Sequence, residues 1–189
     1  MRIAITGGIA EGKSTVLNYV RMAGYETQSS DSIAHQVFCS DPVQSHLASS
    51  LGLSRPISRE AVRSLISADA KARKALNDLM HPLIWEAIAH SSSTFIEVPL
   101  LVEAALYLKF ERVWVVTCGP IQQQQRMIQR IRSKGDLSLD AAELETQRLL
   151  ALQLPTCVKC FFADRIIRTN GSESDVQKYV LEAIKNDCN

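Results

Sequence analysis

The chain has 189 residues, of which 46% are hydrophobic, which suffices for one compact core with small excursions from it. Lysine and arginine number 21 against 20 aspartates and glutamates, so no net field draws the molecule onto a nucleic acid or an anionic membrane. We therefore expect no nucleic-acid partner and no membrane partner, and an anionic ligand must be bound by a local cluster.

The first predicted elements are a strand, a glycine loop and a helix. Arg2–Thr6 is a short apolar run that ends at two glycines, as a buried strand leading into a turn does. Ser14–Met22 carries apolar residues at helical spacing, and Gly24 can end that helix. Tyr25–Ser29 stands where a second strand would follow, but it is too polar to be assigned from its pattern alone.

The rest of the chain alternates apolar runs with helix-length segments. Further strands are predicted at Thr94–Val98, Arg112–Thr117 and Ala163–Arg168. Helices are predicted at 42–51, at 59–89 with an interruption at His81-Pro82, at 120–132, at 139–152, and after the capping pair Ser172 and Asp175. This alternation predicts an α/β fold with a mainly parallel sheet and right-handed crossovers. The helical stretch 32–93 contributes no strand, so it is interpreted as an insertion over the ligand-binding edge of the sheet.

The sequence GGIAEGKS at positions 7–14 matches the phosphate-binding pattern GxxxxGK[ST] in full, between a predicted strand and a predicted helix. Glycines let the loop amides surround phosphates, and the following helix adds its positive N-terminal end. Lys13 is expected to neutralise the β and γ phosphates of ATP, and the Ser14 hydroxyl to bind Mg²⁺. Glu11 is expected to point to solvent, because a carboxylate beside phosphates is unfavourable. The predicted ATP-binding residues are Gly7, Gly8, Ile9, Ala10, Glu11, Gly12, Lys13, Ser14 and Thr15.

A phosphate loop alone leaves kinases, GTPase switches and ATP-driven machines open. The guanine-reading NKxD motif and the switch motif DxxG do not occur in the sequence. Motor and assembly ATPases are usually larger than this chain. A small phosphotransferase is therefore the favoured class.

Several further segments resemble the dephospho-CoA kinase family, in order and along nearly the whole chain. TGGIAEGKST at 6–15 is similar to that family's opening, DSIA at 31–34 to its DxIA stretch, LMHPLI at 79–84 to its lxHPxI motif, and VPLLVE at 98–103 to its vPLLfE motif. Matches to its RxxxR pair and its C-terminal pattern are Arg126 with Arg130, Gln153, Lys159, Ala163-Asp164 and Asn170-Gly171. HPLI together with PLLVE is far more specific than the phosphate loop. The chain departs from the family at Ser29, His35 and Thr169, where aspartate, arginine and asparagine are usual, so the charge pattern around the substrate differs.

The resemblance implies a P-loop kinase fold with a mainly parallel five-stranded sheet flanked by helices. It implies a single domain over 1–189, with a core (1–31, 92–125 and 154–189), a helical substrate-binding insertion (32–91) and a small lid (126–153). It also implies that ATP gives its γ-phosphoryl group to the ribose 3′-hydroxyl of dephospho-CoA, yielding CoA and ADP in the last step of coenzyme A biosynthesis. The rival functions are a kinase for another nucleoside or nucleotide and a non-catalytic ATP-binding module.

The resemblance assigns residue roles, and for some of these residues a structural alternative stays open. The implied catalytic residues are Asp31, Lys13 and Arg130. The implied substrate contacts are Thr6, His81, Pro99, Leu100, Leu101, Glu103 and Arg126. Asn170 is expected to face the adenine of ATP, or to be a plain Asn-Gly turn. Asp31 is alternatively a helix N-cap, His81 a histidine at a helix break, and the arginine pair a solvated basic face. Glu97 is either a Walker B acid or a surface residue.

The five cysteines are odd in number and scattered, which favours free thiols in a reducing compartment. Cys157 and Cys160 have CxxC spacing, but without a second CxxC they are interpreted as two partly buried thiols on a helix. The N-terminus leaves no room for a signal peptide, and no apolar run approaches membrane-spanning length. We therefore expect a cytoplasmic protein.

Overall fold

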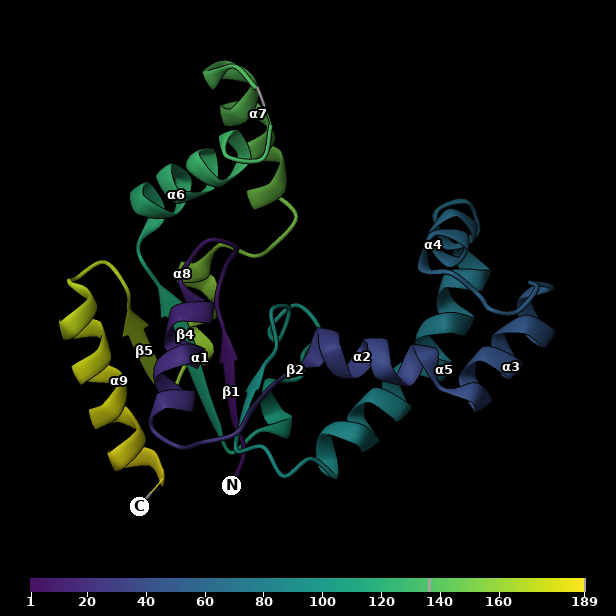
Figure 1. Ribbon diagram of the computed structural model, residues 1–189, viewed down its shortest axis with the longest axis horizontal. Coiled ribbons are helices and arrows are strands. Elements are labelled where there is room, and N and C mark those ends of the chain that lie inside the picture. The colour runs from purple at the N-terminus through teal and green to yellow at the C-terminus, as the bar shows by residue number, and fades with distance from the viewer. Residues whose placement is uncertain (136, 189) are drawn as a thin grey trace. The chain divides into compact units, whose positions relative to one another are not determined.

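The computed structural model describes residues 1–135 and 137–188, which contain an α/β fold with one five-stranded sheet (Figure 1). Its strands are β1 (Ile3–Thr6), β2 (Thr27–Ser29), β3 (Phe95–Glu97), β4 (Arg112–Thr117) and β5 (Arg165–Arg168). They are ordered β2-β3-β1-β4-β5. Strand β1 pairs in parallel with β3 and with β4, and β4 pairs in parallel with β5. Parallel neighbours require crossover connections, and helices supply them.

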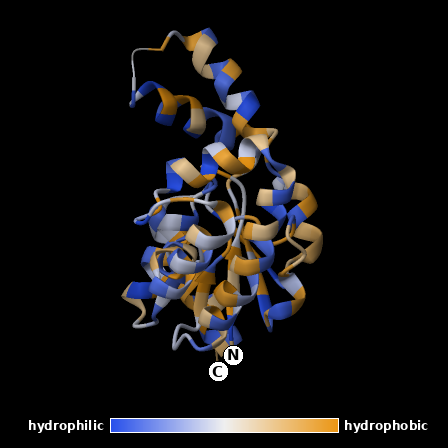
Figure 2. Ribbon diagram, turned by 90° about the vertical axis from the view of Figure 1, so that its right-hand side faces the viewer, coloured by the Kyte–Doolittle hydropathy of each residue, from blue (hydrophilic) through white to orange (hydrophobic). Residues whose placement is uncertain are grey.

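Most of the remaining described residues are helical. The helices are α1 (Lys13–Met22), α2 (Ser30–Cys39), α3 (Asp41–Leu51), α4 (Arg59–Ala68), α5 (Ala70–Ala89), α6 (Pro120–Arg132), α7 (Leu139–Leu150), α8 (Thr156–Lys159) and α9 (Glu173–Cys188), with short 3-10 turns η1 (Tyr107–Lys109) and η2 (Cys160–Phe162). Figure 2 shows that the helices alternate hydrophobic and hydrophilic residues along their ribbons. Such amphipathic helices bury one face and leave the other in water.

The main core lies around the central strands. Strand β1 is buried along its whole length, which requires that both faces of the sheet be covered. The rings of Phe95 and Trp114 are fully buried and meet edge to face with centroids 5.2 Å apart. Each such side chain contributes about 1.5–3 kcal/mol by leaving water. The indole nitrogen of Trp114 donates to Asp187 at 2.7 Å, and Asp187 also accepts from Arg165 at 2.7 Å, so α9 is tied to β4 and β5.

The chain divides into two compact units. The first combines Met1–Gln28 with the chain from Ser93 onward, and it contains the main core. The second, Ser29–Ser92, consists of α2 to α5 around an apolar cluster of its own that includes Phe38, Leu47 and Met80. The boundaries proposed from the sequence also span Asp136 and Asn189, which lie outside the described residues.

All predicted strands are present. Strand β4 has the predicted bounds, while β1, β3 and β5 are one or two residues shorter than their apolar runs. The polar segment Tyr25–Ser29 contains β2 at Thr27–Ser29. Its three residues are all half-buried, which explains why no apolar pattern marks them. Helix α9 begins after Ser172, whose hydroxyl accepts from the amide of Asp175 at 3.2 Å, so the predicted cap is confirmed.

The predicted helix break at His81-Pro82 is wrong. Helix α5 continues through Pro82, and the break between α4 and α5 falls at Asp69. The Asp69 carboxylate accepts from the amide of Lys71 at 2.7 Å, so it caps α5. Apolar residues at helical spacing before and after Pro82 pack into the cluster of the second unit and outweigh the hydrogen bond that a proline cannot donate. The described residues contain no helix that is long and apolar enough to cross a membrane.

Candidate nucleotide site

The phosphate loop connects β1 to α1 in a conformation that only small residues allow. Gly7 and Gly12 have φ angles of 146° and 93°, and Ala10 has a φ of 61°. A Cβ on Gly7 would lie 2.4 Å from the carbonyl oxygen of Val116, and one on Gly8 would lie 2.4 Å from the Gln123 amide nitrogen. At Gly7 the contact is with the backbone of β4, so no side chain fits there, whereas at Gly8 it is with the side chain of Gln123 from α6. The crowding against β4 is a further reason for glycine at position 7, and the role of the loop amides toward phosphates stays a prediction.

Lys13 and Ser14 lie where the motif places them, in the first turn of α1. The Lys13 ammonium donates to the carbonyl oxygens of Gly7 and Gly8 at 3.0 and 2.8 Å, so it lies over the loop. The N-cap of α1 is Gly12, which has no side chain to cap the first amides of the helix. A helix start of this kind, with a cation beside it, attracts an anionic group.

The expectation that Glu11 points to solvent is wrong. Its side chain is 1% exposed, and its carboxylate accepts from the backbone amide of Cys118 just after β4. Its own carbonyl oxygen accepts from the Thr169 hydroxyl at 2.7 Å. Burial, with the nearby Glu11 charge, raises the pKa of the Cys118 thiol to about 11, so this thiol stays protonated at neutral pH. The hydrogen bond from the Cys118 amide replaces the water that the buried Glu11 carboxylate has lost. Glu11 thereby links the phosphate loop to the end of β4.

Ile9 is held through both of its backbone polar groups. Gln123, in the first turns of α6, donates to the Ile9 carbonyl oxygen at 3.0 Å. The Ile9 amide donates to the side-chain oxygen of Gln153, which follows α7, at 3.2 Å. Gln153 matched the family pattern without an assigned role. Gln123 was missed, and its only signal is a run of four glutamines at 122–125.

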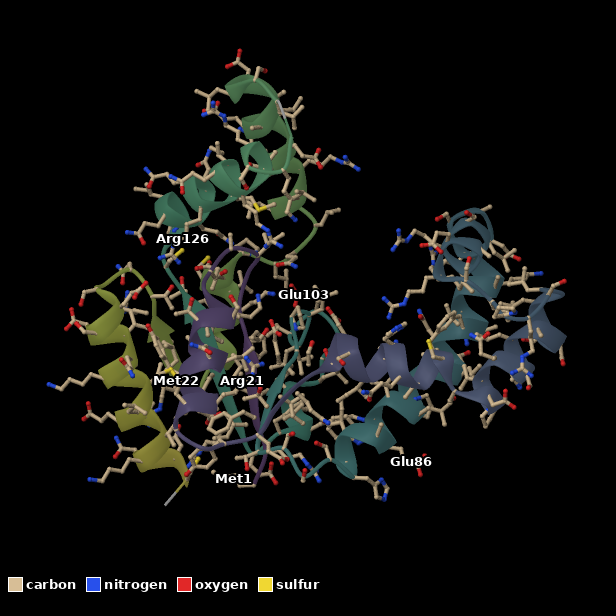
Figure 3. The ribbon with its side chains drawn as sticks, in the orientation of Figure 1. Met1, Arg21, Met22, Glu86, Glu103 and Arg126 are labelled. Atoms are coloured by element: carbon tan, nitrogen blue, oxygen red, sulfur yellow. The ribbon has the colours of Figure 1, made fainter. Side chains whose placement is uncertain are left out.

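Arg126 and Thr169 form a second attachment behind the loop. Figure 3 labels Arg126 on α6, whose guanidinium donates to the hydroxyl and the carbonyl oxygen of Thr169 at 3.2 and 2.7 Å. A Cβ on Gly12 would lie 2.8 Å from that hydroxyl. Thr169, one of the departures from the family, is thus a buried link between α6 and the loop. Asn170 follows it and is exposed.

The segment after β3 is fixed by a buried lysine. Lys159 is completely buried, and its ammonium donates to the Pro99 carbonyl oxygen at 3.0 Å and pairs with Glu103 at 2.8 Å. The Thr6 hydroxyl donates to the same carbonyl oxygen at 3.3 Å, and the amide of Leu154 donates to Glu103 at 3.0 Å. Burial alone would raise the pKa of Glu103, but the hydrogen bonds from Lys159 and from backbone amides outweigh it and lower that pKa.

This arrangement brings together Thr6 and the segment 99–103 among the predicted substrate residues, whereas Arg126 is bonded to Thr169. Thr6 and Leu101 are fully buried, whereas Leu100 is 47% exposed. Figure 3 labels Glu103 on the same segment. Lys159 had matched the family pattern without a role, and its complete burial could not be foreseen from a lone lysine in the sequence.

The second unit contains Asp31 and His81, both exposed. Asp31 lies in the first turn of α2, two residues after β2. It is not the N-cap of that helix: the cap is Ser29, whose hydroxyl accepts from the Asp31 amide at 3.3 Å. Ser29 therefore caps α2, as the aspartate that is usual in the family could also do. His35 lies one turn from Cys39, with Nδ1 3.6 Å from the sulfur.

Cysteine and acidic clusters do not add a metal centre in the described residues. All five cysteines are free thiols, as expected. The interpretation of the CxxC pair as two partly buried thiols on a helix is wrong for Cys157, which is exposed on α8, while Cys160 is partly buried in η2. No group of three or more histidine, cysteine, aspartate or glutamate side chains among the residues described could hold a metal ion. A cation at Ser14 would therefore depend on oxygens of a bound ligand and of water.

A lysine-bearing glycine loop between a buried strand and a helix, set in a parallel sheet ordered β2-β3-β1-β4-β5, defines the P-loop kinase fold. Two solved structures share it. A structure of TT1252 from Thermus thermophilus superposes with a TM-score of 0.78 at 23% identity, covering 100% of this chain and 98% of the other. A dephospho-CoA kinase from Campylobacter jejuni gives a TM-score of 0.65 at 24% identity, covering 98% and 96%.

Sequence comparison identifies the particular family. The family model CoaE, dephospho-CoA kinase, matches residues 1–175. The dephospho-CoA kinase of Escherichia coli (strain K12) is 33% identical over 182 residues, covering 90% of this chain and 84% of that protein. The chain belongs to the dephospho-CoA kinase family, as the HPLI and PLLVE segments indicated.

Proposed function

We propose that the chain transfers the γ-phosphoryl group of ATP to the ribose 3′-hydroxyl of dephospho-CoA, giving CoA and ADP. The observation that carries this proposal is the Lys13 ammonium on a tightly held glycine loop at the start of α1, in a chain of the dephospho-CoA kinase family. Phosphoryl transfer needs positioning and charge neutralisation more than covalent chemistry. This loop can provide both.

The contacts of the phosphate loop indicate how ATP, the phosphoryl donor, is bound. Lys13 exchanges the carbonyl oxygens of Gly7 and Gly8 for phosphate oxygens, which carry more charge and accept stronger hydrogen bonds. Glu11 and Ile9 keep the loop in place through the bonds to β4, α6 and the segment after α7. Asn170, exposed after β5, faces the adenine. Arg130, exposed on α6, approaches the transferring group when the predicted lid closes.

The residues proposed for the acceptor are those that the family resemblance implies. Asp31 accepts the proton of the 3′-hydroxyl or orients that hydroxyl through a hydrogen bond. Its place two residues after β2 supports this role, because ligands of parallel sheets bind beyond the carboxyl ends of the strands. His81 and Arg126 are further residues proposed to contact the acceptor. Thr6 and the segment 99–103 shape the pocket, which Lys159 keeps rigid.

Mg²⁺ fits this site as a cofactor that takes few protein ligands. Ser14 offers one exposed hydroxyl next to Lys13, and no acidic cluster among the described residues competes for the ion. Magnesium usually binds through one or two protein oxygens, substrate phosphates and water. When bound, it would neutralise charge on the β and γ phosphates. We also propose a cytoplasmic location, because five free thiols suit a reducing compartment.

A coupled ADP-release assay with a panel of acceptors tests the proposal. We expect ADP release from ATP and Mg²⁺ that depends on dephospho-CoA, with CoA identified as the product by mass. Release with another nucleoside or nucleotide, and none with dephospho-CoA, would assign a different kinase activity. ATP binding without release for any acceptor would indicate a non-catalytic module.

A further inference from the structure

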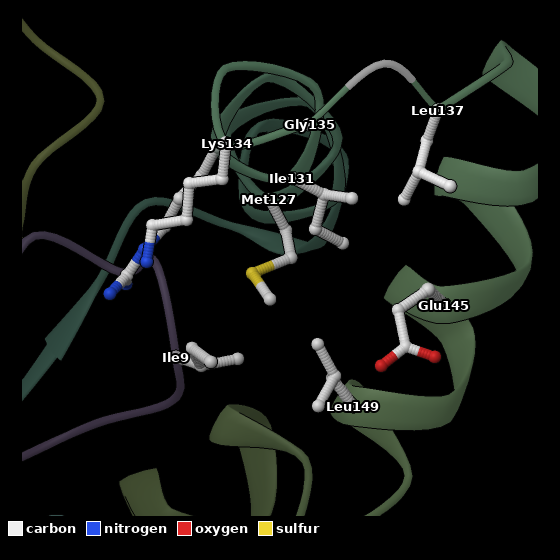
Figure 4. Close-up of a pocket in the computed structure, with 9 residues that line it drawn as sticks. Ile9, Met127, Ile131, Lys134, Gly135, Leu137, Glu145 and Leu149 are labelled. Atoms are coloured by element: carbon white, nitrogen blue, oxygen red, sulfur yellow. The ribbon is translucent and has the colours of Figure 1, made fainter.

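A cavity of about 390 Å³ lies within the first unit, next to the phosphate loop (Figure 4). Its apolar walls are Ile9 from the loop, Met127 and Ile131 from α6, Leu149 from α7, and Leu137 from the segment between these helices. In Figure 4, Met127 and Ile131 face Leu149 across the space, and Ile9 lies at its edge. A space of this size is within the range of small-molecule sites.

The wall formed by the phosphate loop is fixed. Ile9 is bonded through its carbonyl oxygen to Gln123 and through its amide to Gln153, so its side chain is held at the cavity. Lys13, four residues later, is the first residue of α1. A group in the cavity therefore lies beside the nucleotide site, and the ligand that brings it there also approaches the phosphates.

The charged side chains that line the cavity indicate which kind of ligand it can bind. Arg130 and Lys134 line it from one side of α6 and the turn that follows, and both carry positive charge. Glu145 lines it from α7 and is paired with Arg148 at 3.1 Å. None of the described lining residues is aromatic, so the cavity offers no ring on which a base could stack. An uncharged, largely aliphatic chain attached to phosphates matches these walls.

We propose that this cavity binds the amide-containing aliphatic arm that the acceptor carries on its 5′-diphosphate, with Lys134 beside the diphosphate. The inference rests on the proposed function, because dephospho-CoA joins such an arm to an adenosine through a diphosphate. Apolar walls bury the methylene and methyl groups of the arm. The Glu145 carboxylate accepts from an amide or hydroxyl of the arm. The site thereby distinguishes dephospho-CoA from a free adenine nucleotide.

The test fills the cavity with tryptophan. Leu137→Trp changes a side chain that is 45% exposed, so the fold tolerates it, and Leu149→Trp changes the opposite wall. Leu144→Trp is the matched control, since Leu144 lies on α7, is 70% exposed and does not line the cavity. The probe is 4′-phosphopantetheine, which is the arm with one phosphate. Its affinity is measured by calorimetric titration, and KM values for dephospho-CoA and ATP are measured in parallel.

We expect both cavity variants to weaken 4′-phosphopantetheine binding and to raise the KM for dephospho-CoA by about tenfold, as lost burial of one or two methylene-sized groups gives. The KM for ATP should stay within about twofold, and the control should match the wild type. A rise in the KM for ATP instead would assign the cavity to the nucleotide, and unchanged values throughout would show that no ligand occupies it. Binding of the probe to a wild type that does not phosphorylate dephospho-CoA would refute the proposed function and keep the cavity assignment.

Discussion

Replacing Lys159 by methionine tests how strongly the segment after β3 depends on one buried charge. The substitution removes a fully buried ammonium and leaves the Glu103 carboxylate and the Pro99 carbonyl oxygen without that donor. Removing one partner of a buried ion pair costs about 3–5 kcal/mol. In a chain of this length each kcal/mol lowers Tm by about 2–4 °C, so we expect a fall of about 6–20 °C at pH 7. Thermal unfolding followed by circular dichroism measures it.

Two further variants distinguish the effect of breaking this ion pair from the effect of removing any lysine charge. Lys178→Met removes an exposed lysine from α9 and should change Tm by no more than about 2 °C. The double variant Lys159→Met with Glu103→Gln should recover part of the loss, because it leaves no unpaired buried charge. If Lys159→Met unfolded at the same temperature as Lys178→Met, the reasoning about this pair would be wrong.

The same pair has a defined pH dependence. The folded-state pKa of Glu103 is lower than its ordinary value of 4.5, so the stability it contributes is fully present above pH 4.5. That contribution is lost as the pH falls through the lowered pKa, where the carboxylate takes up a proton. The Tm difference between the wild type and Lys159→Met should therefore be constant near neutral pH and narrow in acid below pH 4.5.

Four further substitutions test the site. Lys13→Ala should nearly abolish turnover in a protein with wild-type circular dichroism, because the ammonium serves phosphates and not a core; near-normal turnover would contradict its role. Asp31→Asn should lower kcat by about a hundredfold or more with little change in Tm or ATP binding, whereas a large fall in Tm with intact turnover would make it a structural residue. Arg130→Ala should reduce kcat more than Arg132→Ala, and equal small losses would indicate a solvated surface. Gly7→Ala should abolish ATP binding in titration, because its Cβ would lie 2.4 Å from a backbone oxygen of β4.

The sequence predicts the parallel core well because a strand buried on both faces appears as a short, continuous run of apolar residues. Arg112–Thr117 is such a run, and β4 has those bounds. Strand β2 has half-buried residues throughout, so it could be placed only by its position after α1. The error at Pro82 has a related cause, because the apolar cluster that keeps α5 continuous is formed by residues distant in the sequence.

The motif predicts a tight glycine loop before a helix, and the structure has that loop at Gly7 and Gly12. The roles of these glycines and of Lys13 toward phosphates stay predictions. Glu11 shows the limit of that reasoning. Its orientation depends on a free amide at Cys118, more than a hundred residues away, and no local pattern reports a donor supplied by another strand.

The two glutamines at Ile9 have a mechanical consequence. Gln123 lies near the start of α6 and Gln153 just after α7, so the helical hairpin between them is joined to the phosphate loop at both of its ends and at a single residue. Both bonds end on the backbone of Ile9, so this one residue sets the spacing between the phosphate loop and the two ends of the hairpin. A change at either glutamine should therefore disturb the loop and the hairpin together.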